Sequence, residues 1–345
     1  MSDQPKTSGP RIGRAKRKSI SNSTRDWVEV RPLSDERPNP VLITPKLDEF
    51  DLHEWLTKNR DYVRQLWDEK GSLLFRGFDL GGTAGFAKFV KIFAEGGSLP
   101  YVDRSTPRKE YGKNIYCTTI YPEENSIRLH NEGSYWLVHP GVAFFGCITA
   151  PPVGGATPTG DVGLVYEAID PAIREEFERR DWMLQRNYNA GLSLPWQEVF
   201  QTEDKAQVET YCAENRIKLE WKDGDGLRTQ QVRPAVMIHP RSGVPLWHNH
   251  AAFFHISSQE ESMRAALTAD FAHDELPYNT YYGDGGEIPD DVIAHIHEAY
   301  ESALVRFQWQ EGDLHLVDNL RIAHGRDPYQ GDRLILVSLN EPFVP

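Results

Sequence analysis

The chain has 345 residues, of which 39% are hydrophobic and 26% charged, and it carries 9 Trp, 14 Tyr and 15 Phe. This composition excludes a largely disordered chain, a collagen-like fibre and a small disulfide scaffold, and the length suffices for about two domains or one large one. No apolar run approaches the roughly 20 residues that span a bilayer, and the N-terminus MSDQPKTSGP lacks the apolar stretch of a signal peptide. We therefore expect a cytoplasmic protein with no membrane partner.

Charge divides the chain into a basic beginning and an acidic remainder. Residues 1–25 carry seven Lys or Arg against one Asp and lack periodic apolar positions, which predicts a basic disordered tail. The formal net charge of the whole chain is −13. Because an acidic body repels nucleic acid, we expect no nucleic-acid partner. The three cysteines form no Cys-x-x-Cys pair, so any metal must be held by nitrogen and oxygen.

The first globular elements are a helix, a strand and a second helix. Apolar side chains recur at helical spacing from Leu52 to Trp67, and Gly71 is expected to end this helix. The short apolar segment SLLFRGF is typical of a strand, and residues 84–94 again have helical spacing. Between residues 116 and 150, three β-branched and aromatic runs predict consecutive strands: YCTTIY, IRLHNEGSYW and GVAFFGCIT.

The second half begins with helices and ends with strands. Residues 164–180, interrupted by Pro171, and residues 204–215 are expected to be helical, and a further helix covers 290–305. VRPAVMIH, GVPLWHNH, FQWQEGDLHLVDN and RLILVSLN have strand character. This order predicts an α+β fold with a closed or sandwiched β core, flanking helices and a helical insert at about residues 164–305. We expect residues 26–345 to form a single domain.

His130, Glu132 and His324 are the candidate metal ligands. In a strand, positions two apart share one face and lie about 7 Å apart along the backbone, so His130 and Glu132 can reach one metal. His273 and Glu275 share this spacing, but DFAHDELP is typical of a helix end, where such positions diverge. An iron(II) site of two histidines and one carboxylate takes its third ligand from a distant strand, and His324 follows HLVDN.

Arg333 is the candidate anion-binding residue. It stands nine residues after His324, beyond a turn containing Pro and Gly that returns the chain beside itself. Its guanidinium is therefore placed to grip the far carboxylate of a dicarboxylate that chelates the metal. His255 and Arg264 share the spacing, but Arg264 begins a helical run, so we interpret that pair as coincidental.

Five motifs occur in a fixed order along the chain: I-x-L-H-N-E-x-S-Y-W, P-x-x-G-G-x-T-P, W-x-N at LWHNH, YYGDG and D-N-x-x-x-x-H-G-R-x-P-Y-x-G-x-R. From about Leu47 to Asn340 the sequence thereby resembles the TauD/TfdA family of iron(II)- and 2-oxoglutarate-dependent dioxygenases. Within that family it is most similar to the amino-acid hydroxylases of peptide natural-product pathways, of the syringomycin-type aspartyl hydroxylase kind. The resemblance implies a double-stranded β-helix, or jelly roll.

The resemblance also implies the roles of five residues. His130, Glu132 and His324 would bind Fe(II), and Thr157 and Arg333 would hold the co-substrate 2-oxoglutarate, with O2 as the oxidant. The implied reaction oxidises an unactivated C–H bond of an amino acid, or of an aminoacyl group tethered to a carrier protein, in secondary metabolism. Hydroxylation is favoured over desaturation or oxidative ring closure.

This sequence departs from taurine dioxygenase at Val337. That enzyme has an arginine at this position, four residues after the one that matches Arg333, so its substrate contacts cannot be transferred. Arg128 lies two residues before His130 and is aimed at the same cavity, where it would pair with a substrate carboxylate or, alternatively, with Glu132. The aromatic residues Tyr135 and Trp247 are predicted to line the pocket, with burial in the core as the alternative.

Two other function classes use the same residues. One is a catalytically silent β-helix binding protein, and the other is a zinc-dependent hydrolase. A hydrolase gives no role to Arg333, and a silent protein would have lost part of the ligand set. The further histidines His248, His250 and His255 are expected to pack or to support other residues instead of forming a second metal site.

Overall fold

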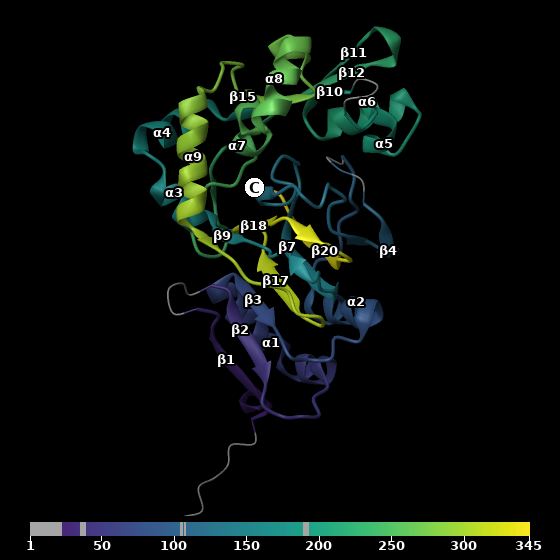
Figure 1. The fold of residues 1–345 in the computed structure, drawn as a ribbon, viewed down its shortest axis with the longest axis vertical. Coiled ribbons are helices and arrows are strands. Elements are labelled where there is room, and N and C mark those ends of the chain that lie inside the picture. The colour runs from purple at the N-terminus through teal and green to yellow at the C-terminus, as the bar shows by residue number, and fades with distance from the viewer. Residues whose placement is uncertain (1–22, 35–38, 104–105, 107, 189–192) are drawn as a thin grey trace, which may run out of the picture.

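The computed structural model describes residues 23–34, 39–103, 106, 108–188 and 193–345 (Figure 1). The predicted basic tail lies outside these residues except for its last three positions, where Ser23 caps a short 3-10 helix, η1 (Thr24–Trp27). Within the described ranges, no helix combines the length and the apolar character needed to cross a membrane.

An eight-stranded sheet forms the centre of the fold, in the order β1-β2-β3-β17-β7-β20-β5-β4. Its described neighbours are antiparallel except β2 and β3, which run parallel. The longest pairing joins β7 to β20, so the chain end predicted as a strand lies at the middle of the sheet. The strands are β1 (Val28–Pro32), β2 (Val41–Pro45), β3 (Ser72–Phe75), β4 (Glu110–Gly112), β5 (Ile115–Cys117), β7 (His139–Thr149), β17 (Leu314–Asp318) and β20 (Leu334–Phe343).

Two helices, α1 (Leu52–Lys70) and α2 (Gly82–Phe93), pack on this sheet. The Asp51 side chain caps the start of α1, and Gly71 ends it with a φ of 76°, as the sequence predicted. The ring of Trp67 meets that of Phe93 edge to face, and both belong to the core between the helices and β3, β7 and β17. In Figure 1 both helices lie in the lower part of the picture, to the right of β2 and β3.

A smaller sheet, in the order β16-β9-β18-β6, carries the candidate metal ligands. Its strands are β6 (Ile127–His130), β9 (Thr159–Asp161), β16 (Leu304–Val305) and β18 (Ile322–Arg326), and a short pair, β8 (Val153–Gly154) and β19 (Tyr329–Gln330), lies beside it. The register of β18 on β6 sets His324 directly opposite His130. Two sheets with helices outside them make an α+β fold, which confirms the fold class at that level.

The predicted helical insert between β9 and β16 also contains strands, and more of them than the two segments that the sequence predicted there. It contains a four-stranded antiparallel sheet, β11-β12-β10-β15. The sequence analysis missed this sheet because the buried face of β12 is mostly polar and so lacks the apolar alternation of a typical strand. Thr229, Gln231 and Arg233 are all buried there. The strands are β10 (Trp182–Tyr188), β11 (Ile217–Trp221), β12 (Leu227–Arg233) and β15 (Tyr278–Tyr282), with a separate pair, β13 (Met237–Ile238) and β14 (Pro245–Leu246).

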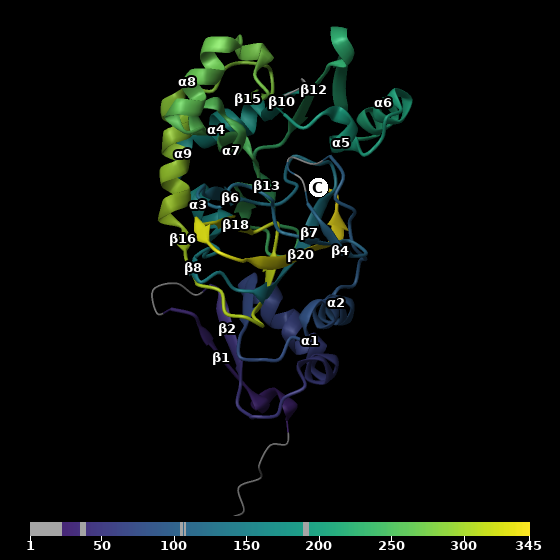
Figure 2. The same cartoon turned by 45° about the vertical axis from the view of Figure 1, so that its right-hand side comes forward.

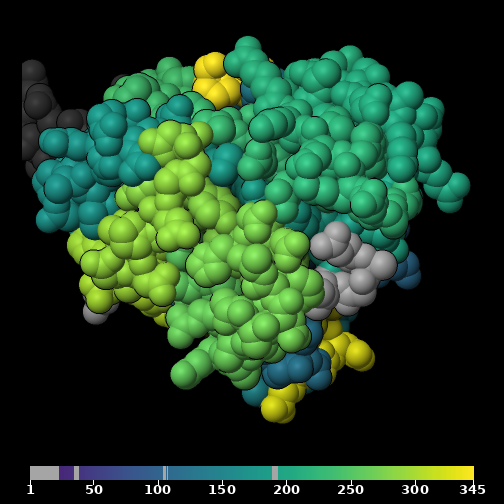
Figure 3. Space-filling view, turned by 90° about the horizontal axis from the view of Figure 1, so that it is seen from above, coloured from purple at the N-terminus to yellow at the C-terminus, as the bar shows by residue number. Residues whose placement is uncertain are grey.

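Most helices of the insert lie near this sheet, at one end of the molecule (Figures 2 and 3). They are α3 (Val162–Ala168), α4 (Pro171–Arg180), α5 (Trp196–Phe200), α6 (Lys205–Glu214), α7 (Ala251–Phe254), α8 (Glu261–Asp270) and α9 (Asp290–Ser302), with 3-10 turns η2 (Asp223–Asp225), η3 (Ile256–Ser258) and η4 (His273–Glu275). One hydrophobic cluster runs from Val337 in β20 to Phe254 in α7, so the insert shares its core with the large sheet.

Candidate active site

His130, Glu132 and His324 converge on one point. One nitrogen or oxygen atom of each lies within 4.8 Å of the others, and within the described residues this is the one such group of three or more His, Cys, Asp or Glu side chains. The two imidazole rings have centroids 4.7 Å apart. The pairing of β6 with β18 therefore brings together residues that are 194 positions apart in the chain.

A pair of buried asparagines fixes the backbone of Glu132. Asn319, in the turn between β17 and β18, accepts a hydrogen bond from the Glu132 N–H at 3.0 Å and donates to the Glu132 carbonyl at 2.9 Å. Asn131 in turn donates to the Asn319 carbonyl at 2.8 Å. These bonds are buried and mutually dependent, so they hold the carboxylate-bearing segment against β18. The D-N motif contains Asn319, but its spacing alone does not reveal this role.

Both imidazoles are suited to bind a metal. His130 Nδ1 donates to the Arg128 carbonyl at 2.9 Å, which leaves Nε2 as the free ligand nitrogen. The side chain of His324 makes no hydrogen bond to the described residues, and its Nδ1 is buried without a partner. Burial lowers the pKa of both rings, and for His324 the neighbouring His130 adds to the effect. Both rings are therefore neutral, the form that coordinates metals.

Arg108, which the sequence analysis missed, pairs with the Glu132 carboxylate. Its Nη2 lies 2.6 Å from Glu132 Oε2, the Tyr101 hydroxyl donates to Oε1 at 3.1 Å, and the guanidinium stacks on the Tyr101 ring at 4.1 Å. Burial alone would raise the pKa of Glu132, but Arg108 and His130 lower it overall, so the group stays ionised. The predicted alternative, an ion pair between Arg128 and Glu132, is wrong. No motif marks Arg108 in the sequence.

A small cavity of about 30 Å³ lies beside the three ligands and is lined by Thr118, Thr157, Arg326 and Arg333. Arg333 donates to the Thr118 hydroxyl at 3.0 Å, its Nε is buried without a partner, and no described carboxylate pairs with it. Burial, together with Arg326, lowers the pKa of Arg333 to about 10. Arg108 and Glu132 also line the cavity but pair with each other, so Arg326 and Arg333 are left without an acidic partner among the described residues and make the cavity suited to an anion.

Thr157 also faces this cavity, as expected. Its hydroxyl oxygen accepts a hydrogen bond from the Trp309 indole N–H at 2.7 Å. Because the oxygen is held from one side and makes no other bond among the described residues, its hydrogen remains available for a ligand oxygen. Thr118 lines the same cavity and was not identified from the sequence.

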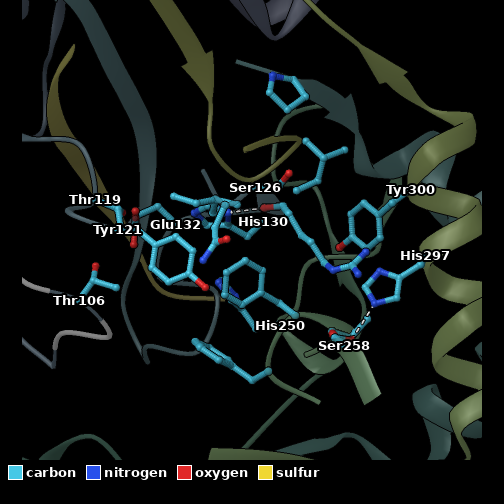
Figure 4. A pocket seen from close by; sticks show the side chains of 18 of the residues that line it. Thr106, Thr119, Tyr121, Ser126, His130, Glu132, His250, Ser258, His297 and Tyr300 are labelled. Atoms are coloured by element: carbon cyan, nitrogen blue, oxygen red, sulfur yellow. Dashed lines mark hydrogen bonds between the residues drawn. The ribbon is translucent and has the colours of Figure 1, made fainter. Parts of the chain in front are cut away.

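A larger cavity of about 430 Å³ also borders His130 and Glu132 and extends between β6, α7 and α9 (Figure 4). Arg128 lines it, and the guanidinium of Arg128 makes no hydrogen bond or ion pair to the described residues. At the end formed by α9, His297 Nε2 donates to the Ser258 hydroxyl at 2.7 Å, and Tyr300 lies beside it. The volume is that of a small-molecule site.

Two predicted lining residues are instead part of the core. Trp247 is fully buried and packs edge to face on Phe177, with ring centroids 5.0 Å apart. Tyr135 is also buried, and its hydroxyl donates to the Asp103 carbonyl at 3.1 Å. Neither residue lines either of the two cavities: Tyr135 lies in the turn after β6 and Trp247 directly follows β14, and both large side chains pack among apolar neighbours.

Among the described residues, the additional histidines belong to no second cluster of possible metal ligands. His248 bonds to the Leu320 carbonyl at 3.0 Å, and His255 bonds to the Ser257 hydroxyl at 2.7 Å, so both support local structure as expected. His250 differs, because its ring lines the large cavity.

Comparison with known proteins identifies the family. The family model described as taurine catabolism dioxygenase TauD, TfdA family, matches residues 29–339. The chain belongs to the TauD/TfdA family. It is therefore a 2-oxoglutarate-dependent dioxygenase that uses Fe(II), 2-oxoglutarate and O2, and neither the zinc hydrolase nor the silent binding protein is favoured.

The dapdiamide synthesis protein DdaC of Enterobacter agglomerans is 39% identical over 316 residues, which covers 92% of this chain and 95% of DdaC. A clavaminate synthase-like protein of Arabidopsis thaliana is 26% identical over 322 residues, with coverage of 90% and 92%. The crystal structure of PvcB from Pseudomonas aeruginosa superposes with a TM-score of 0.53 at 17% identity, covering 93% of this chain and 92% of PvcB. The dioxygenase family thus spans nearly the whole chain.

Proposed function

We propose that this dioxygenase oxidises a C–H bond of an amino acid in secondary metabolism, with hydroxylation as the favoured outcome. The observation that carries the proposal is the convergence of His130, Glu132 and His324 beside a small cavity that contains Arg326 and Arg333, next to a larger cavity that contains the unpaired guanidinium of Arg128. The name of DdaC, which refers to dapdiamide synthesis, supports a place in the synthesis of a natural product.

The two main sheets support a jelly-roll assignment, and the hydrophobic cluster that joins them to the insert supports a single domain over residues 26–345. The likeness of fold to PvcB is consistent with both assignments.

The residues present fit the metal and the co-substrate. His130, Glu132 and His324 would hold Fe(II), since they form a nitrogen and oxygen set in which the His324 imidazole has no other described partner. Thr157 and Arg333 would hold 2-oxoglutarate. When bound, Fe(II) with 2-oxoglutarate and O2 supplies the oxidant for the C–H bond. The cavity beside Arg333 has room for about two waters, hence for one carboxylate, and the rest of the diacid would extend toward the metal.

Arg128 supports a free amino acid over a tethered one. Its guanidinium would bind a substrate carboxylate, which an aminoacyl thioester on a carrier protein lacks. Glu260 and Glu301 line the same cavity, so charges of both signs are available for a zwitterion.

Release of succinate from 2-oxoglutarate, with free amino acids as substrates and mass spectrometry of the products, tests the proposal. We expect the reaction to depend on Fe(II) and on one or a few amino acids. The His130→Ala variant should show none of it. Normal turnover by His130→Ala would remove the metal assignment, and stimulation by carrier-bound substrates alone would remove the choice of a free amino acid.

A further inference from the structure

His250 presents an imidazole nitrogen to the large cavity beside the proposed metal ligands. Its ring centroid lies 5.6 Å from that of His130, and both rings line the cavity (Figure 4). His250 Nδ1 is hydrogen-bonded to the Ser134 hydroxyl. Nε2 has no hydrogen-bond partner among the described residues. It is not one of the polar atoms that are fully buried without a partner, so it is accessible from the cavity. Neither the metal site nor the 2-oxoglutarate site gives this nitrogen a role.

The hydrogen-bond network sets which atom of His250 carries the hydrogen. Ser134 is 1% exposed, and His250 Nδ1 is the only acceptor that the described residues offer its hydroxyl. If the hydroxyl hydrogen pointed elsewhere, a buried donor would be left without an acceptor, which is unfavourable. Ser134 therefore donates to Nδ1, and the hydrogen of the neutral ring is on Nε2. A protonated ring also carries a hydrogen on Nε2, so the cavity contains an N–H donor in either state.

The ring is held in place before any substrate arrives. Its ring stacks on that of Phe254 with centroids 5.2 Å apart, and the ring of Tyr135 lies perpendicular to it with centroids 5.3 Å apart. The preceding residue, Asn249, accepts a hydrogen bond from the Ala251 N–H at 2.9 Å, which fixes the start of α7. A donor that is already positioned loses little conformational freedom when it binds a ligand.

We propose that His250 is a positioning residue that donates a hydrogen bond from Nε2 to a carbonyl or carboxyl oxygen of the substrate, close to the carbon that is oxidised. The inference rests on the proposed function and extends it to the chemical class of the substrate. An N–H group donates to an amide or carboxylate oxygen and disfavours an ammonium group, itself a donor, at the same place. With Arg128 holding the α-carboxylate, the substrate side chain itself must carry the oxygen.

The first test observes the tautomer. Nitrogen-15 correlation spectra of the full chain, with labelled histidine, Zn(II) in the metal site and 2-oxoglutarate added, should show His250 as the Nε2–H form, assigned by its loss in His250→Phe. Ser134→Ala should release this preference. Ser242→Ala is the matched control. The Ser242 hydroxyl also forms a hydrogen bond with a histidine, His239 Nδ1, at 2.9 Å, but neither residue lines the cavity. An Nδ1–H form of His250 in the unaltered protein would overturn the proposal.

The second test uses L-asparagine, L-glutamine, L-aspartate and L-glutamate as probes, with L-leucine and L-lysine as controls. We expect at least one of the four to shift the His250 Nε2 signal and to bind about 3–10-fold more weakly to His250→Phe, the loss of one hydrogen bond. His250→Gln, which retains a donor, should recover most of the affinity, a rescue that a purely structural role would not give. An equal loss for L-leucine, or no shift with any of the four, would overturn the inference.

Calorimetric titration of the Mn(II)-loaded protein with 2-oxoglutarate separates the two levels of the proposal. Absence of binding to the unaltered protein would refute the proposed function. Binding of 2-oxoglutarate together with an unresponsive His250 would refute only the role of this histidine.

Discussion

Replacing Arg333 with Met should stabilise the protein in the absence of 2-oxoglutarate while it removes most of the affinity for that molecule. Arg333 is a largely buried cation beside Arg326, without a carboxylate partner among the described residues. Burial, reinforced by Arg326, lowers the pKa of its guanidinium to about 10. This shift means that the charged form of Arg333 is about 3 kcal/mol less favourable in the folded protein, relative to the neutral form, than it is in water.

The two expected effects have opposite signs. Partial exposure of Arg333 and its hydrogen bond to Thr118, worth about 1 kcal/mol, reduce the gain in the free energy of unfolding to about 1–2 kcal/mol. Leaving a bound carboxylate unpaired costs about 2–5 kcal/mol, which is at least a 30-fold loss of affinity for 2-oxoglutarate. A site built to bind an anion is thus unfavourable for the protein when the anion is absent.

Urea unfolding without 2-oxoglutarate, combined with titration of 2-oxoglutarate, measures both effects. Arg326→Met is the matched control, because Arg326 donates hydrogen bonds to the carbonyls of Tyr121, Pro122 and Asn125 and should lose stability when replaced. If Arg333→Met is less stable by more than about 1 kcal/mol, or keeps its affinity, then Arg333 is a structural residue and our reasoning fails.

Three further variants probe the surroundings of the site. Arg108→Met should lower the free energy of unfolding of the metal-free protein by about 3–5 kcal/mol, because Glu132 is left as an unpaired buried charge. With saturating Mn(II) the loss should be clearly smaller. An equal loss in both states would contradict the pairing of Arg108 with Glu132. His315 is buried and neutral, with a pKa lowered by burial to about 3, whereas the unfolded chain takes up this proton near pH 6.5. Stability should therefore fall by about 2 kcal/mol more between pH 7 and pH 5 in the unaltered protein than in His315→Gln, as measured by urea unfolding; parallel pH curves would refute this. Trp247→Ala should lower the free energy of unfolding by about 3–5 kcal/mol, yet the variant protein that still folds should bind cavity ligands normally. Weakened ligand binding would indicate that Trp247 lines the cavity after all.

The sequence by itself determined the class of the protein and the identity of the candidate ligands. Local signals were sufficient for this: Gly71 ends α1, the spacing of His130 and Glu132 suits a strand end, and a turn separates His324 from Arg333. These features depend on residues close together in the chain, where backbone geometry alone fixes which side chains share a face. The order of the motifs then indicated the family.

Only the tertiary structure decided which groups surround the ligands. Arg108 contacts Glu132 from 24 positions away in the sequence, and Asn319 holds the backbone of Glu132 from 187 positions away. No local pattern encodes such contacts. The same limit applies to the insert, where the polar inward face of β12 concealed a strand, and to Trp247 and His250, which lie three residues apart yet face the core and the cavity respectively. Whether a large side chain packs or binds depends on what the rest of the fold sets against it, and that is decided in three dimensions.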